Sequence, residues 1–436
     1  GLSIAYAACL LILSFINHEY SHDKFHKNRS DIYKLTYSTK WANDEYKDMH
    51  LHDFKLVDRL KSDVPQVKNA CAYRKAWGAI SKYGENTFDD ILGIVDPEFL
   101  NMFSYPLMAG NPEKVLQTPG EVVISRKFAD KIIDKKSGNY SQLLGETIEF
   151  LNIQDVPFRI TGILEEPPKP SSIKFDLLIN YNYQRYFGQS YECFGNSIVF
   201  VELSDGSNPA SAKKTTEEVV KSYYEEKINR FKSEGRISDT HDFVQAGMEN
   251  VSDLHFQDNI NNGYLSLGSR SKMNILAMIG LIILLTACCN FLLFSYGQTR
   301  RKVHYVGVMK VYGASRSQIM KLVWVEAYIL NIASILTGLI ISMILLPVFE
   351  HYTQVELSTP PTGRLLIPAI IIVSLFSSIL AALPYYFFFK DSNPVLLLKK
   401  QIVKRDKNAA SSAFIIFQYL ISSILVIGTI VVFKQT

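Results

Sequence analysis

The strongest constraint in this sequence is a set of long apolar segments separated by polar ones. An α-helix needs ~20 apolar residues to cross the hydrocarbon core of a bilayer. Four segments reach that length: Met273–Gly297, Leu322–Val348, Leu365–Phe389 and Ala413–Phe433. A fifth apolar segment, Leu2–Ile16, is shorter and begins almost at the first residue. We therefore expect an α-helical membrane protein with five spans, of which the first is truncated.

The first apolar segment has a second interpretation, a secretory signal peptide. Such a peptide has a basic region before its apolar core and a small-residue cleavage site after it. Neither is visible around Leu2–Ile16. Residue 1 is Gly rather than Met, and the last apolar segment ends close to Thr436. We therefore expect a fragment of a longer chain that is cut inside its first helix, and the signal peptide stays open as the alternative.

The charges between the apolar segments predict how the chain is oriented, because Lys and Arg gather in cytoplasmic loops. Residues 299–321 contain only basic charges, and residues 390–412 form a second linker in which basic residues outnumber acids. The loop Phe349–Gly363, by contrast, carries only two charges, Glu350 and Glu356, and both are acidic. Alternation of the spans then places the long stretch 17–272 outside as well.

The composition agrees with this division and excludes other classes of protein. Of the 436 residues, 47% are hydrophobic and 20% are charged, and the mean hydropathy of +0.05 is high for a wholly soluble chain. Such values exclude a disordered or collagen-like chain. The five cysteines are scattered and form no Cys-x-x-Cys pair, which argues against a disulfide framework and a zinc ribbon.

Residues 17–272 are long enough for a substantial core, and we expect an α+β domain of two lobes. Alternating apolar residues predict strands at Ile32–Thr39, Glu121–Ser125, Thr147–Ile153, Phe158–Leu164, Ile173–Asn180 and Ser197–Leu203. Helical spacing predicts helices at His52–Ser62, from Arg126 to about Lys135, and at Pro209–Ser233. The strands at 147–153 and 158–164 should form a hairpin that turns at Asp155-Val156-Pro157.

One motif in this region resembles a metal site. His18-Glu19-Tyr20-Ser21-His22 matches H-E-x-x-H, in which two histidines on a helix hold zinc and the Glu acts as general base. His26 would follow on the same helix face. No downstream residue is marked as a third ligand, so we expect a polar helix end whose side chains are solvated. A membrane zinc protease is a remote alternative.

The basic stretch 299–321 has the pattern of a helical hairpin. Gly313 suits the position just after a helix end, and Ser315-Arg316-Ser317-Gln318 matches a capping box that starts the next helix. Tyr305, Val306, Val308 and Met309 would place apolar surface beside the charges. This pattern predicts either a knob that docks another protein or an ordinary basic loop.

The sequence of this hairpin, together with other motifs, resembles the MacB/FtsX-like permeases of ABC transporters, most closely the long permeases of Bacteroidetes-type bacteria. The motifs that carry the resemblance extend over most of the chain. They are the run from Asn290 through Arg300-Arg301-Lys302, Val306-Gly307-Val308-Met309-Lys310 and Gly313-Ala314-Ser315; Glu326; Phe25-His26-Lys27-Asn28 with Ile32-Tyr33; Asp96-Pro97-Glu98-Phe99; Pro106-Leu107; Gly110; Glu121–Ser125; Gly145; Ile160-Thr161-Gly162; Pro167-Pro168; and Asn393-Pro394-Val395.

The resemblance implies a domain organisation. Residues 1–16 would be the truncated first span, and 17–272 a MacB-like periplasmic core domain with a ferredoxin-like lobe and an inserted lobe at about 96–179. Residues 273–389 would be an FtsX-like three-helix unit that contains the coupling hairpin 299–321. A basic cytoplasmic linker, 390–412, would lead to a fifth span at 413–433, which opens a second unit.

The resemblance also implies a function. The chain contains no G-x-x-x-x-G-K-[ST] loop, so we expect it not to be an enzyme and to receive work from a separate cytoplasmic ABC ATPase. That ATPase would grip the hairpin through Arg300, Arg301, Lys302, Val306, Gly307, Val308, Met309, Lys310, Gly313, Ala314, Ser315 and Arg316. Its nucleotide cycle would move the periplasmic domain, a mechanism called mechanotransmission.

The expected cargo is a peptide, drug or lipoprotein, and the transported molecule itself is beyond the sequence. The implied partners are the ATPase, a second permease or a homodimer partner, a periplasmic adaptor and membrane lipids. No nucleic acid, metal or cofactor is expected. A membrane sensor or scaffold, or a regulator of an envelope enzyme, would share the topology and remains the alternative.

Overall fold

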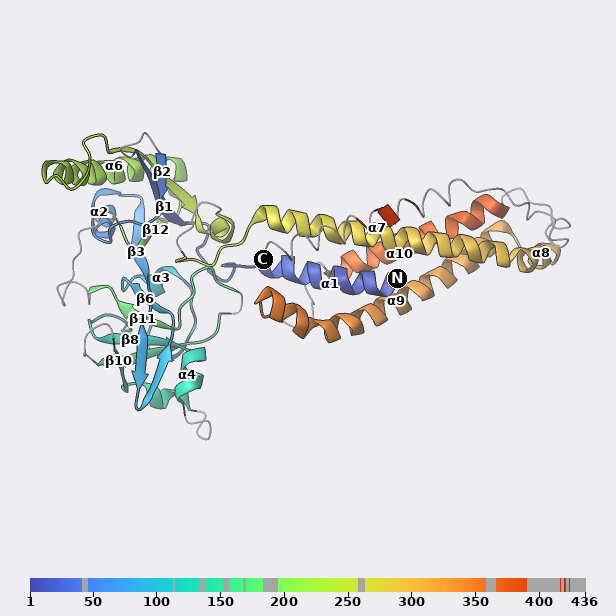
Figure 1. Ribbon diagram of the computed structural model, residues 1–436, viewed down its shortest axis with the longest axis horizontal. Coiled ribbons are helices and arrows are strands. Elements are labelled where there is room, and N and C mark those ends of the chain that lie inside the picture. The colour runs from blue at the N-terminus through green and yellow to red at the C-terminus, as the bar shows by residue number, and fades with distance from the viewer. Residues whose placement is uncertain are drawn as a thin grey trace. The chain divides into compact units, whose positions relative to one another are not determined.

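The computed structural model describes residues 1–40, 46–112, 114–133, 139–151, 157–167, 170–182, 195–257, 263–357, 366–389, 416, 419, 420 and 423. The chain divides into two compact units. The outer domain is Glu19–Arg270, and the helical unit combines Gly1–His18 with Ser271–Thr436 (Figure 1).

The outer domain is built on one mixed β-sheet. Its strands are β1 (Ile32–Lys40), β2 (Tyr46–Met49), β3 (Val67–Ala76), β4 (Ile80–Tyr83), β5 (Asn86–Asp89), β6 (Leu92–Val95), β7 (Leu107–Gly110), β8 (Glu121–Ser125), β9 (Thr147–Phe150), β10 (Phe158–Leu164), β11 (Leu177–Asn180), β12 (Ile198–Leu203) and β13 (Asp242–Asn250). They follow the order β13-β1-β12-β3-β6-β11-β8-β10-β9-β4-β5, with β2 beside β1 and β7 beside β10. Most neighbours are antiparallel, but β6 runs parallel to β11 and β8 to β10.

Both faces of this sheet are buried, because successive side chains of a strand point to opposite faces. In β8, Val122 and Ile124 enter one apolar cluster while Val123 enters the other. The first face is covered by α2 (Leu56–Asp63), α4 (Arg126–Ile132), the 3-10 helix η1 (Tyr140–Leu143) and α6 (Pro209–Ser233). The short helices α3 (Phe99–Met102) and η2 (Val251–Phe256) cover the second face.

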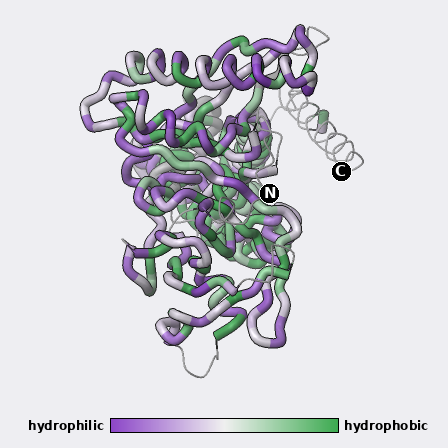
Figure 2. The backbone as a smooth tube through the Cα atoms, turned by 90° about the vertical axis from the view of Figure 1, so that its left-hand side faces the viewer, coloured by the Kyte–Doolittle hydropathy of each residue, from purple (hydrophilic) through white to green (hydrophobic). Residues whose placement is uncertain are grey.

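Figure 1 shows the strands stacked one above another between α6 and α4. In Figure 2, hydrophilic and hydrophobic residues alternate along α6, the helix at the top. That alternation is typical of a helix that buries one stripe on a sheet and exposes the other.

Several predicted elements are confirmed. The strands β8 and β10 and the helix α6 have the predicted bounds, and β1 and β12 differ from prediction by one residue. The β9–β10 hairpin is confirmed by the pairing of Phe158 with Ile148. Of its predicted turn, Asp155-Val156-Pro157, the first two residues lie outside the described residues.

Other predictions are wrong in extent. The helix expected from His52 begins at Leu56, because His52 instead pairs with Ser197 as an isolated bridge. The strand expected from Ile173 begins at Leu177, and α4 ends at Ile132. The strands β2 to β7 and β13 were not predicted, because their polar residues and short lengths hide the two-residue period.

The helical unit contains α1 (Leu2–Glu19, whose last residue belongs to the outer domain), α7 (Arg270–Arg301), α8 (Val303–Val311), α9 (Arg316–Thr353) and α10 (Leu366–Phe389). Three stretches of described helix are long and apolar enough to cross a membrane: Leu2–Glu19, Arg270–Thr299 and Arg316–Thr353. Within α10, Ile370–Leu383 is a shorter apolar helix. The expected linker 390–412 and nearly all of the expected span 413–433 lie outside the described residues.

A small core holds the helical unit together. Leu2, Ala5 and Tyr6 of α1 pack with Ala287 of α7, and Ile335 of α9 and Val373 of α10 lie against them. Many apolar side chains of α9, and several of α7, are exposed, as expected of surfaces that face lipid.

Candidate coupling site at the hairpin

The candidate site is the hairpin between α7 and α9, and a Schellman motif forms its turn. Helix α8 ends at Val311, and Gly313 has φ +84°, a left-handed conformation that glycine adopts without steric cost. Its N–H donates to the carbonyl of Lys310 (3.1 Å), and the N–H of Ala314 donates to the carbonyl of Met309 (2.9 Å). These two bonds define the motif and confirm the predicted role of Gly313.

A capping box then starts α9. The Ser315 hydroxyl accepts a hydrogen bond from the N–H of Gln318 (3.3 Å), and the Gln318 side-chain oxygen accepts one from the N–H of Ser315 (2.8 Å). Two backbone donors that a helix start leaves unpaired are thus satisfied. The predicted helix–break–helix geometry is therefore confirmed.

One face of α8 is buried in the helical unit. Val303 and Val306 pack with Ile319 and Val323 of α9, and with Ala382 and Tyr385 of α10. Val306 is 2% exposed. The expectation that Val306 contributes exposed apolar surface is therefore wrong: a nine-residue helix is held in place only by burying one face, and Val303 and Val306 form that face.

The opposite face and the tip of the hairpin are exposed. Tyr305 is 55% exposed, Val311 is 61% exposed and Tyr312 is 87% exposed. Among the predicted coupling residues, Val306 and Gly307 are buried, Lys302, Val308, Met309, Lys310 and Ala314 are half-buried, and Arg301, Gly313, Ser315 and Arg316 are exposed. The side chain of Arg300 lies outside the described residues. The predicted coupling residues did not include Val311 and Tyr312, although these two residues directly precede the break at Gly313.

An ion pair ties the break between α7 and α8 to α9. The Lys302 Nζ lies 2.6 Å from Glu326 Oε2 and also contacts Oε1. An acid inside an apolar helix is unusual and points to a partner. That signal marked Glu326 in the sequence, but 24 residues separate the two side chains and only the fold pairs them.

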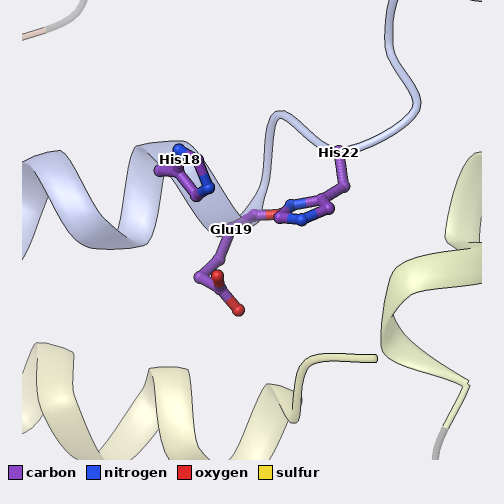
Figure 3. Close-up of side chains that lie close together, drawn as sticks. All are labelled: His18, Glu19 and His22. Carbon is purple, nitrogen blue, oxygen red and sulfur yellow. The ribbon is translucent and has the colours of Figure 1, made fainter. Parts of the chain in front are cut away.

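The H-E-x-x-H motif does not lie on one helix, because α1 ends at Glu19 and the chain then turns. Even so, one ligand atom from each of His18, Glu19 and His22 lies within 4.8 Å of the others (Figure 3). Glu19 Oε2 lies 3.0 Å from Nε2 of His255, and the His22 ring stacks on the His255 ring at 3.5 Å.

Two expectations about this motif are wrong. Glu19 and His22 are each 8% exposed and so are not solvated, since the His255 ring lies against both side chains. His26 does not continue a helix face: it is buried beside Phe103 and Tyr105, and its Nδ1 accepts a hydrogen bond from the N–H of Ser104 (3.2 Å). Burial, with a smaller effect of Arg29, lowers the pKa of His26 to about 3, so the ring is neutral at neutral pH.

Two family models match the chain. The model of the MacB-like periplasmic core domain matches residues 1–219, and the model of the FtsX-like permease C-terminal region matches residues 277–392. Together with the apolar helices, these matches show a membrane protein that carries a large α+β domain of the extracytoplasmic type.

Known proteins resemble the chain more distantly. It is 22% identical over 287 residues to the pyoverdine export ATP-binding/permease protein PvdT of Pseudomonas savastanoi pv. phaseolicola, a match that covers 64% of this chain and 39% of that protein. A domain assigned to a permease protein of Porphyromonas gingivalis is similar with 19% identity and a TM-score of 0.43, over 58% of this chain and 98% of that one. The periplasmic region of MacB from Actinobacillus actinomycetemcomitans is similar with 16% identity and a TM-score of 0.36, over 53% and 95%.

Proposed function

Because this chain belongs to the MacB/FtsX-like permease family, we propose that it is the membrane-spanning subunit of an ABC transporter, driven by a separate cytoplasmic ATPase. The hairpin is the observation that carries the proposal. It is fixed by a Schellman motif, a capping box and the Lys302–Glu326 ion pair, and its tip nevertheless exposes large apolar side chains. A rigid apolar tip is what a docking surface requires, because exposed aromatic side chains supply much of the energy of protein association.

The charges around the tip support the same partner. Arg301 and Arg316 are exposed at the two ends of the hairpin, and no acid lies between them. The groove that receives the tip should therefore combine an apolar floor with an acidic rim. Basic residues at the rim would speed association and select the partner, while Tyr305, Val311 and Tyr312 would supply affinity.

The connection to the outer domain supports mechanotransmission. Glu19, the first residue of the outer domain, is the last residue of α1, and Arg270, its last residue, is the first of α7. Movement of either helix therefore reaches the outer domain through one peptide bond. Within the described part of the apolar helices, Glu326 is the acid closest to the hairpin, and it is paired with Lys302. This arrangement favours transmission of force over a polar path for cargo.

The finer features of the proposal follow the family. We expect five spans, a location in the bacterial inner membrane with the outer domain in the periplasm, and coupling through the residues named above for the hairpin. The cargo class is a peptide, drug or lipoprotein. A second permease copy, a periplasmic adaptor and lipids complete the assembly. Alternatively, the same movement of the outer domain could regulate an envelope enzyme. The remote alternative, a zinc protease, is contradicted if the purified chain carries no zinc.

A pull-down experiment with two matched tyrosines tests the docking surface. Tyr312→Asp places a charge on the 87% exposed tip, whereas Tyr352→Asp changes a 78% exposed tyrosine at the other end of α9. We expect the ATP-binding protein that co-purifies with the wild-type chain to be lost at least tenfold with Tyr312→Asp, since a buried aromatic anchor contributes about 2 kcal/mol or more. Tyr352→Asp should retain it. Equal recovery with both variants contradicts the assignment of the tip, and a wild-type chain without any ATP-binding partner contradicts the function.

A further inference from the structure

The helical unit contains a chain of buried hydrogen bonds that lies away from the hairpin and joins three helices. The Tyr6 hydroxyl of α1 donates to Oδ1 of Asn331 on α9 (2.6 Å), and Nδ2 of Asn331 donates to the Ser377 hydroxyl of α10 (2.6 Å). The three residues are 3%, 0% and 1% exposed, respectively. One asparagine thus joins three helices, of which α1 is distant in the sequence: Tyr6 lies 325 residues before Asn331.

The depth of Asn331 makes these bonds significant. It lies nine residues after Leu322, the start of the apolar segment, which places it about 14 Å along the helix and near the middle of a ~30 Å hydrocarbon core. Water does not compete for polar groups at that depth, so an amide that lost its partners would remain unsatisfied. Burying an asparagine there costs free energy unless its amide group is hydrogen-bonded, as it is here.

Close backbone contact reinforces the link between α1 and α9. Gly338 lies two turns beyond Asn331, and a Cβ atom at that position would be 2.9 Å from the carbonyl oxygen of Ser3 and 2.9 Å from Cβ of Tyr6. Beside it, the Thr337 hydroxyl donates to the Ser3 hydroxyl (2.8 Å). Only glycine permits this approach, so α1 lies directly against the helix that begins at the hairpin.

We infer that Asn331 is a positioning residue that makes α1, α9 and α10 move as one body, so that force from the hairpin reaches the outer domain through α1. The inference rests on the proposed function, because it specifies the route of the transmitted movement. Helix α9 starts at the capping box of the hairpin, Asn331 links it to Tyr6, and α1 ends at the first residue of the outer domain. Helix α7 is also bonded to its neighbours, by the Ser295 hydroxyl to the carbonyl of Ala381 on α10 (2.6 Å) and by the Cys9 thiol of α1 to the carbonyl of Gly280 (3.5 Å), but each of these bonds joins only two helices.

The first measurement is a cross-link that needs no ATPase. Ser3→Cys and Thr337→Cys are introduced into the full chain with its native cysteines replaced by alanine, and disulfide formation in lipid nanodiscs reports contact between α1 and α9. We expect the fraction of chains without the disulfide to rise about threefold with Tyr6→Phe. With Asn331→Leu, which removes two hydrogen bonds, this fraction should rise about tenfold. Ser342→Ala is the matched control, because that buried hydroxyl on α9 donates to Leu339 of its own helix (2.8 Å).

The second measurement separates positioning from stability. A cysteine at Tyr20, which is 41% exposed and directly follows α1, is labelled with a maleimide in the presence and absence of ATP and the co-purified ATPase. With Asn331→Leu and with Tyr6→Phe, we expect ATPase recovery to be retained while the ATP-dependent change in labelling falls at least threefold. Tyr6→Phe keeps the ring in place, so it remains informative if Asn331→Leu does not fold.

Each outcome decides between the two proposals. Reduced cross-linking and a reduced labelling response, with ATPase recovery unchanged, support the inference. If both variants behave as Ser342→Ala does, the inference is overturned and the proposed function stands. If the wild-type chain shows no ATP-dependent labelling, the proposed function fails and the inference falls with it.

Discussion

At the scale of single residues, buried histidines constrain the outer domain most. His52 is fully buried, and its Nδ1 lies 3.1 Å from the hydroxyl of Tyr224, whose ring stacks on Tyr37. His26 is buried on the other face of the sheet, beside Phe103. Burial lowers the pKa of each ring to about 3, because a charged imidazole would lose its hydration. The native fold therefore accommodates both imidazole rings only in their neutral form.

The outer domain should lose stability on mild acidification. The folded-state pKa of about 3 lies below the usual 6.5, so the unfolded chain binds protons that the native state does not. The stabilisation is fully present above pH 6.5 and is lost as the pH falls toward 3. At pH 5 the expected cost is about 2 kcal/mol for each histidine. Thermal unfolding of the wild-type chain between pH 7.5 and pH 5 measures this loss.

A variant identifies the histidine responsible. In His52→Asn the side-chain amide takes the position of Nδ1, which faces the Tyr224 hydroxyl, but does not titrate, so the fall in unfolding temperature between pH 7.5 and pH 5 should be smaller by about half. An unchanged pH dependence would show that other groups cause the acid sensitivity.

At the scale of elements, the hairpin depends on where its helices end. Helix α8 has only nine residues, too few to be stable alone in water. Its end is set by the left-handed Gly313, its inner face by Val303 and Val306, and its start by Lys302, which Glu326 holds. The local sequence therefore defines both helix ends, whereas the tertiary packing keeps α8 folded.

Gly313→Ala should loosen α8 without creating a clash. No atom lies within 4 Å of a Cβ at this position, so the penalty is confined to the φ of +84° and amounts to about 1–2 kcal/mol. Hydrogen–deuterium exchange of residues 303–314 should become roughly tenfold faster. Gly297→Ala is the control, because Gly297 lies inside α7 with an equally open Cβ position and a helical backbone. Faster exchange in the control, or none in Gly313→Ala, would contradict this account of the turn.

At the scale of the whole molecule, the sequence predicts some features better than others. The apolar segments, the charge of the loops, Gly313 and the capping box were predictable because each depends on residues close together in the chain. The sheet order was not, since β1 pairs with β12 and β13 from the far end of the domain. The Lys302–Glu326 pair, the burial of Val306 and the Tyr6–Asn331–Ser377 chain were missed for the same reason: each joins residues that only the fold brings together.

The pairing of β1 with β13 predicts how far the chain must extend before the outer domain can fold. Strand β1 pairs with β13 from Tyr33 opposite Asn250 to Lys40 opposite Asp242. A chain that ends at His241 should therefore lack a protease-resistant outer domain, whereas one that ends at Gln257 should retain it. Both lack α7 to α10 equally, so limited proteolysis in membranes isolates the contribution of β13 and η2. Equal resistance of the two chains would show that β13 is dispensable.

The attachment of the outer domain at two points has a mechanical consequence. A rigid body held at one point can turn about three axes, but a body held at two points can turn only about the line that joins them. The outer domain continues into α1 at Glu19 and into α7 at Arg270. A tilt about that line is therefore the motion that leaves both attachments in place, and one proteolytic cut within the domain would leave both pieces anchored to the membrane.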